Sequence, residues 1–283
     1  MKWRIGDVVV TKIVELETTG GSRFILPAAT REAIQPISWL VPHFADADGR
    51  LKMSIHALVV EAPGRRIVVD TCLGNDKQGR RIPTWNERQG RFLDDLAAAG
   101  FDRETIDTVL CTHLHVDHVG WNTMLVEGQW VPTFPNARYL FGRVEYEHWS
   151  TQSTRADMRT VFDDSVEPVL ARGLAELVEL DHEICPEVRL VPSTGHSPGH
   201  TSVLISSRGE RALITGDFAH HPCQFARPEW PSTADYDPTA AEATRRRILA
   251  ELAGEPVLVI GTHFAGPTAG HVVRDGDAYR LAV

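Results

Sequence analysis

One short stretch of the chain concentrates side chains that can bind metal ions. It runs from His113 to His118 and also contains His115 and Asp117, so three imidazoles and one carboxylate lie within a few positions. Imidazole nitrogens and carboxylate oxygens are common protein ligands of divalent metals. Because clustered imidazoles gain little from one another unless a cation organises them, the stretch predicts a metal site rather than a solvated loop.

The residues before this stretch must position it. The apolar segment 108–112 is typical of a short buried strand, and Val119-Gly120 follows the cluster. On an extended backbone, His113 and His115 point the same way because they are two positions apart. Asp117 and the next histidine come where the chain must turn, toward a second point in space. One segment could therefore serve two adjacent metal ions.

Three other expected strands end in residues that can bind metals. His196 follows the segment 187–191, Asp217 follows 211–215, and His263 follows 256–260. Each residue alone fits an ordinary turn. Loops at strand ends are where α/β proteins place their sites, so together these residues predict one shared centre.

The rest of the chain alternates expected strands and helices. Further strands are expected at 7–16, 55–61, 66–70, 138–141 and 202–206, with a terminal hairpin over 272–281. Helices are expected at 87–99, within 143–149, within 166–177, and from Asp237-Pro238 through Leu252, where Asp237 is a good N-cap. No change of composition marks a linker. We therefore expect one domain over 1–283, in which 1–54 is an N-terminal extension and loop that packs near the active site.

Composition narrows the partners and the compartment. The chain has 283 residues and a formal net charge of −9, which disfavours nucleic acid and anionic membranes as partners. No apolar run approaches the roughly 20 residues of a membrane span, and the N-terminus lacks the pattern of a signal peptide. The four cysteines are widely spaced, as expected for free thiols in a reducing compartment. These features predict a cytoplasmic protein.

The order and spacing of the ligand residues resemble the metallo-β-lactamase-fold hydrolases. The resemblance runs from about residue 55 to 265 and rests on His113-x-His115-x-Asp117-His118 followed by His196, Asp217 and His263. It implies an α/β fold of the four-layer αβ/βα sandwich type, with a binuclear site at one edge. It also implies that Asp70, at the end of an expected strand, supports the site.

The resemblance further implies a division of the ligands between two metal ions and a bridge. The first ion would take His113, His115 and His196, the second would take Asp117, His118 and His263, and Asp217 would bridge them. A nitrogen-rich site without thiolates suits Zn²⁺, and also manganese, iron or cobalt. We therefore expect two divalent ions, with Zn²⁺ as the first choice.

Two adjacent ions can hold a hydroxide that attacks a carbonyl carbon or a phosphorus. Asp117 would orient this nucleophile or pass a proton. The resemblance makes β-lactam hydrolysis less favoured, because class B β-lactamases commonly use Cys in the second site, whereas this chain has Asp217. The predicted function is a hydrolase of small-molecule carboxylic esters or lactones.

His220 is the residue that bears most on the substrate. Quorum-quenching lactonases of this fold usually have Tyr three residues after the bridging Asp, whereas His220 occupies that position here. With a histidine at that position, the chain resembles the methyl parathion hydrolase-like branch of the family. This resemblance makes organophosphate triester hydrolysis the main alternative function. We expect His220 to assist an oxyanion or a leaving group, whereas His200 and His221 are expected to be structural or to support the ligands.

The resemblance also bears on the oligomeric state and on alternative functions. Members of the branch that this chain resembles are often dimeric, so the resemblance implies a homodimer by analogy alone. A β-lactamase, a glyoxalase II-type thioesterase and a non-catalytic metal-binding scaffold are weaker alternatives. Aromatic residues in the irregular segments are candidates for the pocket wall or for core: Trp39, Phe44, Trp85, Trp121, Phe218, Phe225, Trp230 and Phe264.

Overall fold

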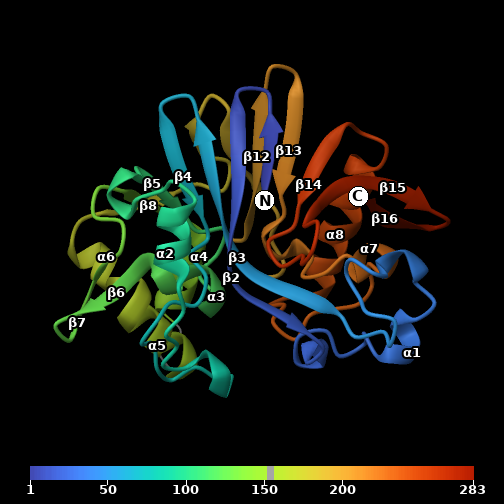
Figure 1. The fold of residues 1–283 in the computed structure, drawn as a ribbon, viewed down its shortest axis with the longest axis horizontal. Coiled ribbons are helices and arrows are strands. Elements are labelled where there is room, and N and C mark those ends of the chain that lie inside the picture. The colour runs from blue at the N-terminus through green and yellow to red at the C-terminus, as the bar shows by residue number, and fades with distance from the viewer. Residues whose placement is uncertain (152–155) are drawn as a thin grey trace.

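Two seven-stranded sheets form the centre of the molecule (Figure 1). The computed structural model describes residues 1–151 and 156–283. The first sheet has the order β1-β2-β3-β4-β5-β8-β9. Its strands are β1 (Lys2–Ile5), β2 (Val8–Thr19), β3 (Lys52–Ala62), β4 (Arg65–Val69), β5 (Thr108–Leu110), β8 (Arg138–Gly142) and β9 (Ala175–Val178).

The second sheet keeps its strands in chain order, from β10 to β16. They are β10 (Glu183–Cys185), β11 (Val188–Pro192), β12 (Thr201–Ser207), β13 (Glu210–Ile214), β14 (Val257–Ile260), β15 (Ala269–Asp275) and β16 (Ala278–Ala282). A separate hairpin pairs β6 (Thr123–Val126) with β7 (Gln129–Pro132). Parallel pairing joins β4, β5, β8 and β9 in the first sheet and β13 to β14 in the second.

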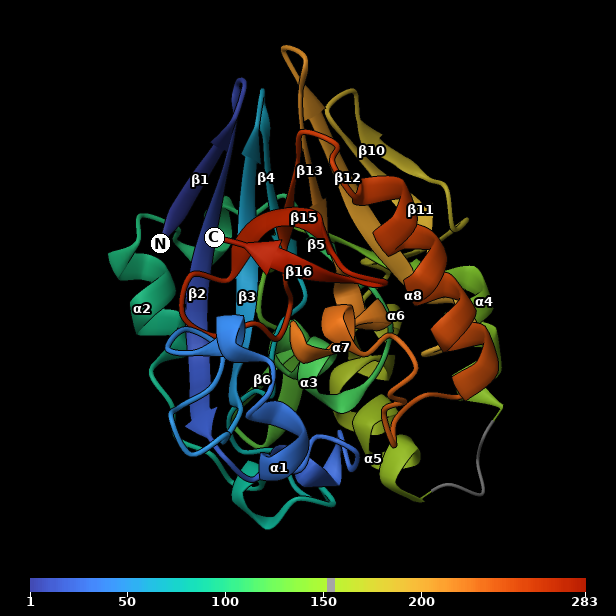
Figure 2. The same cartoon turned by 90° about the vertical axis from the view of Figure 1, so that its right-hand side faces the viewer.

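Three apolar clusters hold the layers together. Alternate residues of β4, such as Ile67 and Val69, meet Val203 and Ile214 of the second sheet in a core between the sheets. Val68 faces the other way, into a core with the helices that cover the first sheet. Those helices are α2 (Phe92–Ala98), α4 (Arg143–Ser150), α5 (Ala156–Ser165) and α6 (Glu167–Ala171). A third core lies under α1 (Arg31–Ile34), α7 (Cys223–Ala226) and α8 (Pro238–Leu252) on the second sheet (Figure 2). The expected four-layer α/β sandwich is confirmed.

Several local predictions are confirmed. The hairpin of β3 and β4 and the terminal hairpin of β15 and β16 both form. The carboxylate of Asp237 caps α8 by accepting hydrogen bonds from the backbone N–H groups of Thr239 and Ala240, both at 3.0 Å.

One predicted helix is wrong in extent. The helix expected at 87–99 begins only at Phe92, because the preceding residues bond to the loop before them: Glu87 donates its N–H to the carbonyl of Lys77. The helix predicted within 166–177 is confirmed as α6, and Gly173, whose φ is +68°, follows its end before β9 begins.

Residues 18–54, part of the expected N-terminal extension and loop, contain regular elements. Strand β2 continues to Thr19, β3 begins at Lys52, and α1 lies between them. The apolar side chains of this segment, including Leu26, Leu40 and Phe44, are buried with α7 and α8 on the second sheet. Within the described residues, no helix has the length and apolar character to cross a membrane.

Candidate functional site

The histidine cluster leaves the first sheet at the end of β5. The chain runs irregularly from Cys111 to His115, which is the N-cap residue of the short helix α3 (Val116–Val119). Asp117 therefore lies in the first turn of α3. Nε2 of His113 is 3.1 Å from Nδ1 of His115, so the two rings converge as the spacing predicted.

A loop of the second sheet completes a first group of three nitrogens. His196 lies between β11 and β12, and its Nε2 is 3.2 Å from Nε2 of His113 and 3.0 Å from Nδ1 of His115. The ligating atoms of these three residues are close enough to hold a metal ion. The two halves of the molecule therefore meet at this group.

A second group forms beside the first. Nε2 of His263, in the loop after β14, is 3.3 Å from Nε2 of His118 and 3.6 Å from Oδ2 of Asp117. Nε2 of His118 is 3.7 Å from Oδ1 of Asp117. These three residues also have their ligating atoms close enough for one metal ion.

The carboxylate of Asp217 lies between the two groups. Its Oδ2 is 3.5 Å from Nε2 of His196 and 3.3 Å from Nε2 of His118, and its Oδ1 is 3.2 Å from Nε2 of His263. Asp217 follows β13 directly after Gly216, whose φ is +54°. A carboxylate that faces ligands of both groups has the geometry of a bridge.

The described residues fit two divalent cations. Pairs of imidazole nitrogens face each other at 3.0 to 3.3 Å, where two lone pairs repel unless a proton or a cation lies between them. Both ring nitrogens of His220 are buried without a hydrogen-bond partner in the described chain. Nitrogen-rich, thiolate-free ligands suit zinc and similar first-row metals.

The electrostatics of the site separate its histidines into two kinds. Burial holds the pKa of His113 and of His196 well below the ordinary value, which leaves their rings neutral and able to ligate. Burial would also lower the pKa of His118, but the carboxylates of Asp217, Asp70 and Asp117 outweigh it and raise that pKa well above normal. The site therefore favours positive charge at its second group.

Hydrogen bonds fix which nitrogen each histidine presents. Nδ1 of His118 is 2.9 Å from Oδ2 of Asp70, which also accepts a hydrogen bond from the hydroxyl of Thr112 at 2.9 Å. Nδ1 of His263 is 3.0 Å from the carbonyl oxygen of Ser54. In both residues the Nδ1–H is the donor to its oxygen partner, so Nε2 keeps the lone pair that faces the centre.

Asp235 is a supporting residue that the sequence analysis missed. Its Oδ1 lies 2.9 Å from Nδ1 of His196, and its Oδ2 accepts a hydrogen bond from the N–H of Ser232 at 2.8 Å. Arg245 of α8 lies behind it, with Nη2 at 3.8 Å from Oδ2. No motif surrounds Asp235, so only the fold reveals its partner.

The three remaining histidines of these loops have different environments. His220 faces the centre, with Nε2 at 3.3 Å from Oδ2 of Asp217, and burial lowers its pKa to about 3. Nε2 of His200 accepts a hydrogen bond from the backbone N–H of Asp217 at 2.6 Å. His221 faces away and donates from Nε2 to the carbonyl of Phe44 at 2.8 Å. His200 therefore orients Asp217, and His221 anchors the N-terminal segment.

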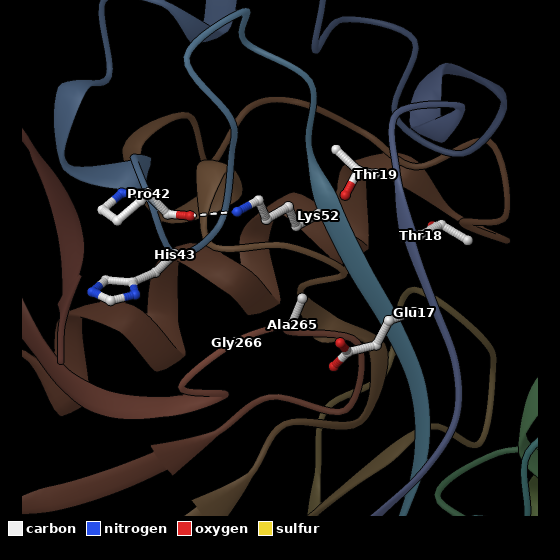
Figure 3. Close-up of a pocket in the computed structure, with 8 residues that line it drawn as sticks. All are labelled: Glu17, Thr18, Thr19, Pro42, His43, Lys52, Ala265 and Gly266. Atoms are coloured by element: carbon white, nitrogen blue, oxygen red, sulfur yellow. Dashed lines mark hydrogen bonds between the residues drawn. The ribbon is translucent and has the colours of Figure 1, made fainter.

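Most aromatic residues considered for the pocket wall belong to the core. Five are almost fully buried within the apolar clusters: Phe44, Trp121, Phe218, Phe225 and Phe264. A cavity of about 320 Å³ lies beside Ala265, two residues after His263, and its wall includes Glu17 and Lys52 (Figure 3). Lys52 donates a hydrogen bond to the carbonyl of Pro42 at 2.7 Å, and none of the seven ligand candidates lines this cavity.

Comparisons with known proteins identify the family of the chain. The family model of the metallo-beta-lactamase superfamily matches residues 52–263. N-acyl homoserine lactonase AiiA of Bacillus thuringiensis subsp. kurstaki is 24% identical over 224 residues, which cover 75% of this chain and 82% of that protein. An N-acyl homoserine lactonase of Bacillus sp is 27% identical over 226 residues, with the same coverage.

Solved structures share the fold over almost the whole chain. The dizinc quorum-quenching lactonase AidC, solved in complex with a product, has a TM-score of 0.81 and 21% identity, covering 99% of this chain and 96% of its own. Hydrolase AbOPH of the beta lactamase superfamily has a TM-score of 0.80 and 24% identity, covering 100% and 96%. The family match includes all seven ligand candidates, and the chain belongs to the metallo-beta-lactamase superfamily.

Proposed function

We propose that this protein is a binuclear metal-dependent hydrolase that opens a lactone ring or cleaves a carboxylic ester. The observation that carries the proposal is the position of Asp217, whose two oxygens face histidines of both groups. A first ion would be held by His113, His115 and His196, a second by Asp117, His118 and His263, and Asp217 would bridge them.

The chain's own residues supply orientation and proton handling. When bound, two divalent ions would provide a hydroxide at neutral pH and polarise the attacked carbonyl. Asp117 has 17% of its side chain exposed, against 4% for Asp217. It is therefore the carboxylate better placed to exchange a proton with solvent at the reacting centre.

His220 would act as a hydrogen-bond donor. Because its pKa is lowered to about 3, its ring is neutral at physiological pH and carries one N–H. A neutral imidazole next to Asp217 can donate to the substrate oxygen on which negative charge develops, or to the departing alkoxide. Burial of the ring, which is 2% exposed, keeps this donor in place.

The relatives and the site together support this substrate class. Curated relatives that match three quarters of the chain are N-acyl homoserine lactonases, and AidC was solved with its product. A lactone and an open ester present the same carbonyl to the site. An organophosphate triester is the second candidate, because His220 occupies the position where lactonases of this fold usually have Tyr.

A substrate panel tests the proposal. Zinc-loaded protein should be assayed on a long-chain N-acyl homoserine lactone, an aryl ester, a phosphotriester and a cephalosporin, with chelated protein as the control for each. We expect the highest kcat/KM on the lactone or the ester. A higher kcat/KM on the phosphotriester would favour the second candidate, and turnover of none of the four would contradict the hydrolase.

A further inference from the structure

Glu145 is a fully buried carboxylate outside the ligand groups. It lies in the first turn of α4 and has no exposed surface. Four donors from three segments of the chain surround its two oxygens. A buried charge is tolerated only when it is well hydrogen-bonded, so this residue holds a structurally demanding position.

The donors divide evenly between the two oxygens. Oε1 accepts from the backbone N–H of Leu114 at 3.1 Å and from Nε1–H of Trp149 at 2.7 Å. Oε2 accepts from the hydroxyl of Ser197 and from the backbone N–H of Gly199, both at 2.8 Å. Three of these four donors are N–H groups that cannot accept, so the site fits the ionised carboxylate.

Two of these segments carry the first ligand group. Leu114 lies between His113 and His115, and Ser197 directly follows His196. One carboxylate on the first half of the molecule therefore reaches both the loop of β5 and the loop between β11 and β12. It spans the two loops whose imidazole nitrogens come within 3.2 Å of each other.

Close packing reinforces this link. A Cβ atom added at Gly199 would lie 2.4 Å from the backbone nitrogen of Glu145 and 2.6 Å from its Cβ, so only glycine allows the loop to approach α4 this closely. Trp149, one turn further along α4, places its ring 5.5 Å from that of His115. Helix α4 therefore touches both loops through two independent contacts.

We propose that Glu145 is a positioning residue that sets the separation between His196 and the pair of His113 and His115. This inference rests on the proposed metal site, because its consequence is the affinity of the ion held by those three residues. A glutamine at this position would turn an NH₂ group toward one pair of donors. Two of the four hydrogen bonds would then be lost without a change of side-chain size.

The test is the stepwise zinc affinity of Glu145→Gln in the full chain, measured by competition with a chromophoric chelator. Loss of support of a ligand typically weakens metal binding about 10- to 100-fold. We expect a weakening of this size for one of the two ions and wild-type affinity for the other. Glu147→Gln, an exposed residue of the same helix, is the matched control and should leave both affinities unchanged.

Thermal unfolding of the metal-free proteins separates positioning from a general folding role. The inference would be overturned if Glu145→Gln lowered the affinity for both zinc ions equally and also lowered the Tm of the metal-free protein. Unchanged affinities for both ions would overturn it as well. If Glu145→Gln does not fold, Ser197→Ala is the second variant, because it removes only one of the four donors. It should still lower the affinity for one zinc ion and not for the other, and equal affinities for wild type and Ser197→Ala would overturn the inference. A wild-type protein that binds no zinc would instead refute the proposed function, and this inference with it.

Discussion

Nδ1 of His196 lies 2.9 Å from Oδ1 of Asp235, a residue 39 positions further along the chain. This contact fixes the imidazole so that Nδ1 carries the proton and Nε2 presents its lone pair to His113 and His115. The second oxygen of Asp235 is held by the N–H of Ser232. The orientation of a ligand candidate thus depends on a loop that contributes none of the seven ligand candidates.

Asp235→Asn should weaken metal binding without unfolding the protein. An amide NH₂ would face either Nδ1–H of His196 or the N–H of Ser232, so one hydrogen bond is lost. We expect about 10- to 100-fold weaker zinc binding, measured by chelator competition. Asp277→Asn, at an exposed position, is the control. Unchanged zinc affinity in Asp235→Asn would show that this contact does not support the site.

His220→Ala should reduce turnover while leaving zinc bound. Loss of one preorganised donor at a developing oxyanion typically lowers kcat about 10²- to 10³-fold. The measurements are kcat on the best substrate and zinc per chain after gel filtration. Full activity would remove His220 from the chemistry. Loss of one zinc would reassign it as a ligand, for which its place near His196 and Asp217 gives the geometry.

His221→Ala should affect stability instead. The His221 side chain donates a hydrogen bond to the carbonyl of Phe44 and accepts one from the N–H of Cys223 at 3.0 Å. Its removal therefore leaves this buried carbonyl and this N–H without their partner. We expect a loss of about 1–3 kcal/mol in the free energy of unfolding, measured in urea, with kcat per folded molecule unchanged. A fall in kcat at equal stability would contradict the distinction between these adjacent histidines.

Lys77 should make stability depend on pH. Burial lowers the pKa of Lys77 from 10.5 to about 7. The carboxylates of Asp164 and Asp76 oppose this shift because they favour the protonated amine. Oδ1 of Asp164 lies 3.6 Å from Nζ of Lys77 but only 2.9 Å from Nη2 of Arg80, so the two cations share its charge. Between pH 7 and about 10 the unfolded chain binds a proton that the folded chain does not. The free energy of unfolding should therefore rise with pH across this window.

Lys77→Met isolates this contribution. The difference in unfolding free energy between wild type and variant should shift in favour of wild type from pH 7 to pH 9.5, because other titrating groups are common to both. Urea unfolding at the two pH values measures it. Parallel pH profiles would mean that Lys77 keeps its proton in the folded protein throughout.

The loops that bring the ligand candidates together could be predicted from sequence because their residue chemistry is local. Histidine and aspartate at strand ends are identifiable by residue type, and the Asp237-Pro238 pair marks the start of α8 for the same reason. Strand β1 and the hairpin of β6 and β7 were missed because each of these strands has only four residues, the lower limit of what a local pattern can identify as a strand. Their pairing depends on partners that the local sequence does not specify.

The supporting residues could not be predicted because their roles depend on contacts between distant segments. Glu145 meets its partners in the loop of His196 more than fifty positions away. Phe44 and Phe264 were considered for a pocket wall, but their rings lie 6.4 Å apart in the core. The sequence alone does not distinguish an aromatic residue of the pocket wall from one of the core, because the difference lies in the packing around it.

Zinc titration of the metal-free protein tests the central claim most directly. Protein stripped by a chelator should be inactive on the lactone or ester that wild type turns over best. Activity should return as zinc is added and reach its plateau at two equivalents per chain, in line with two ligand groups joined by Asp217. Full activity in the stripped protein, or a plateau at one equivalent, would contradict a binuclear mechanism.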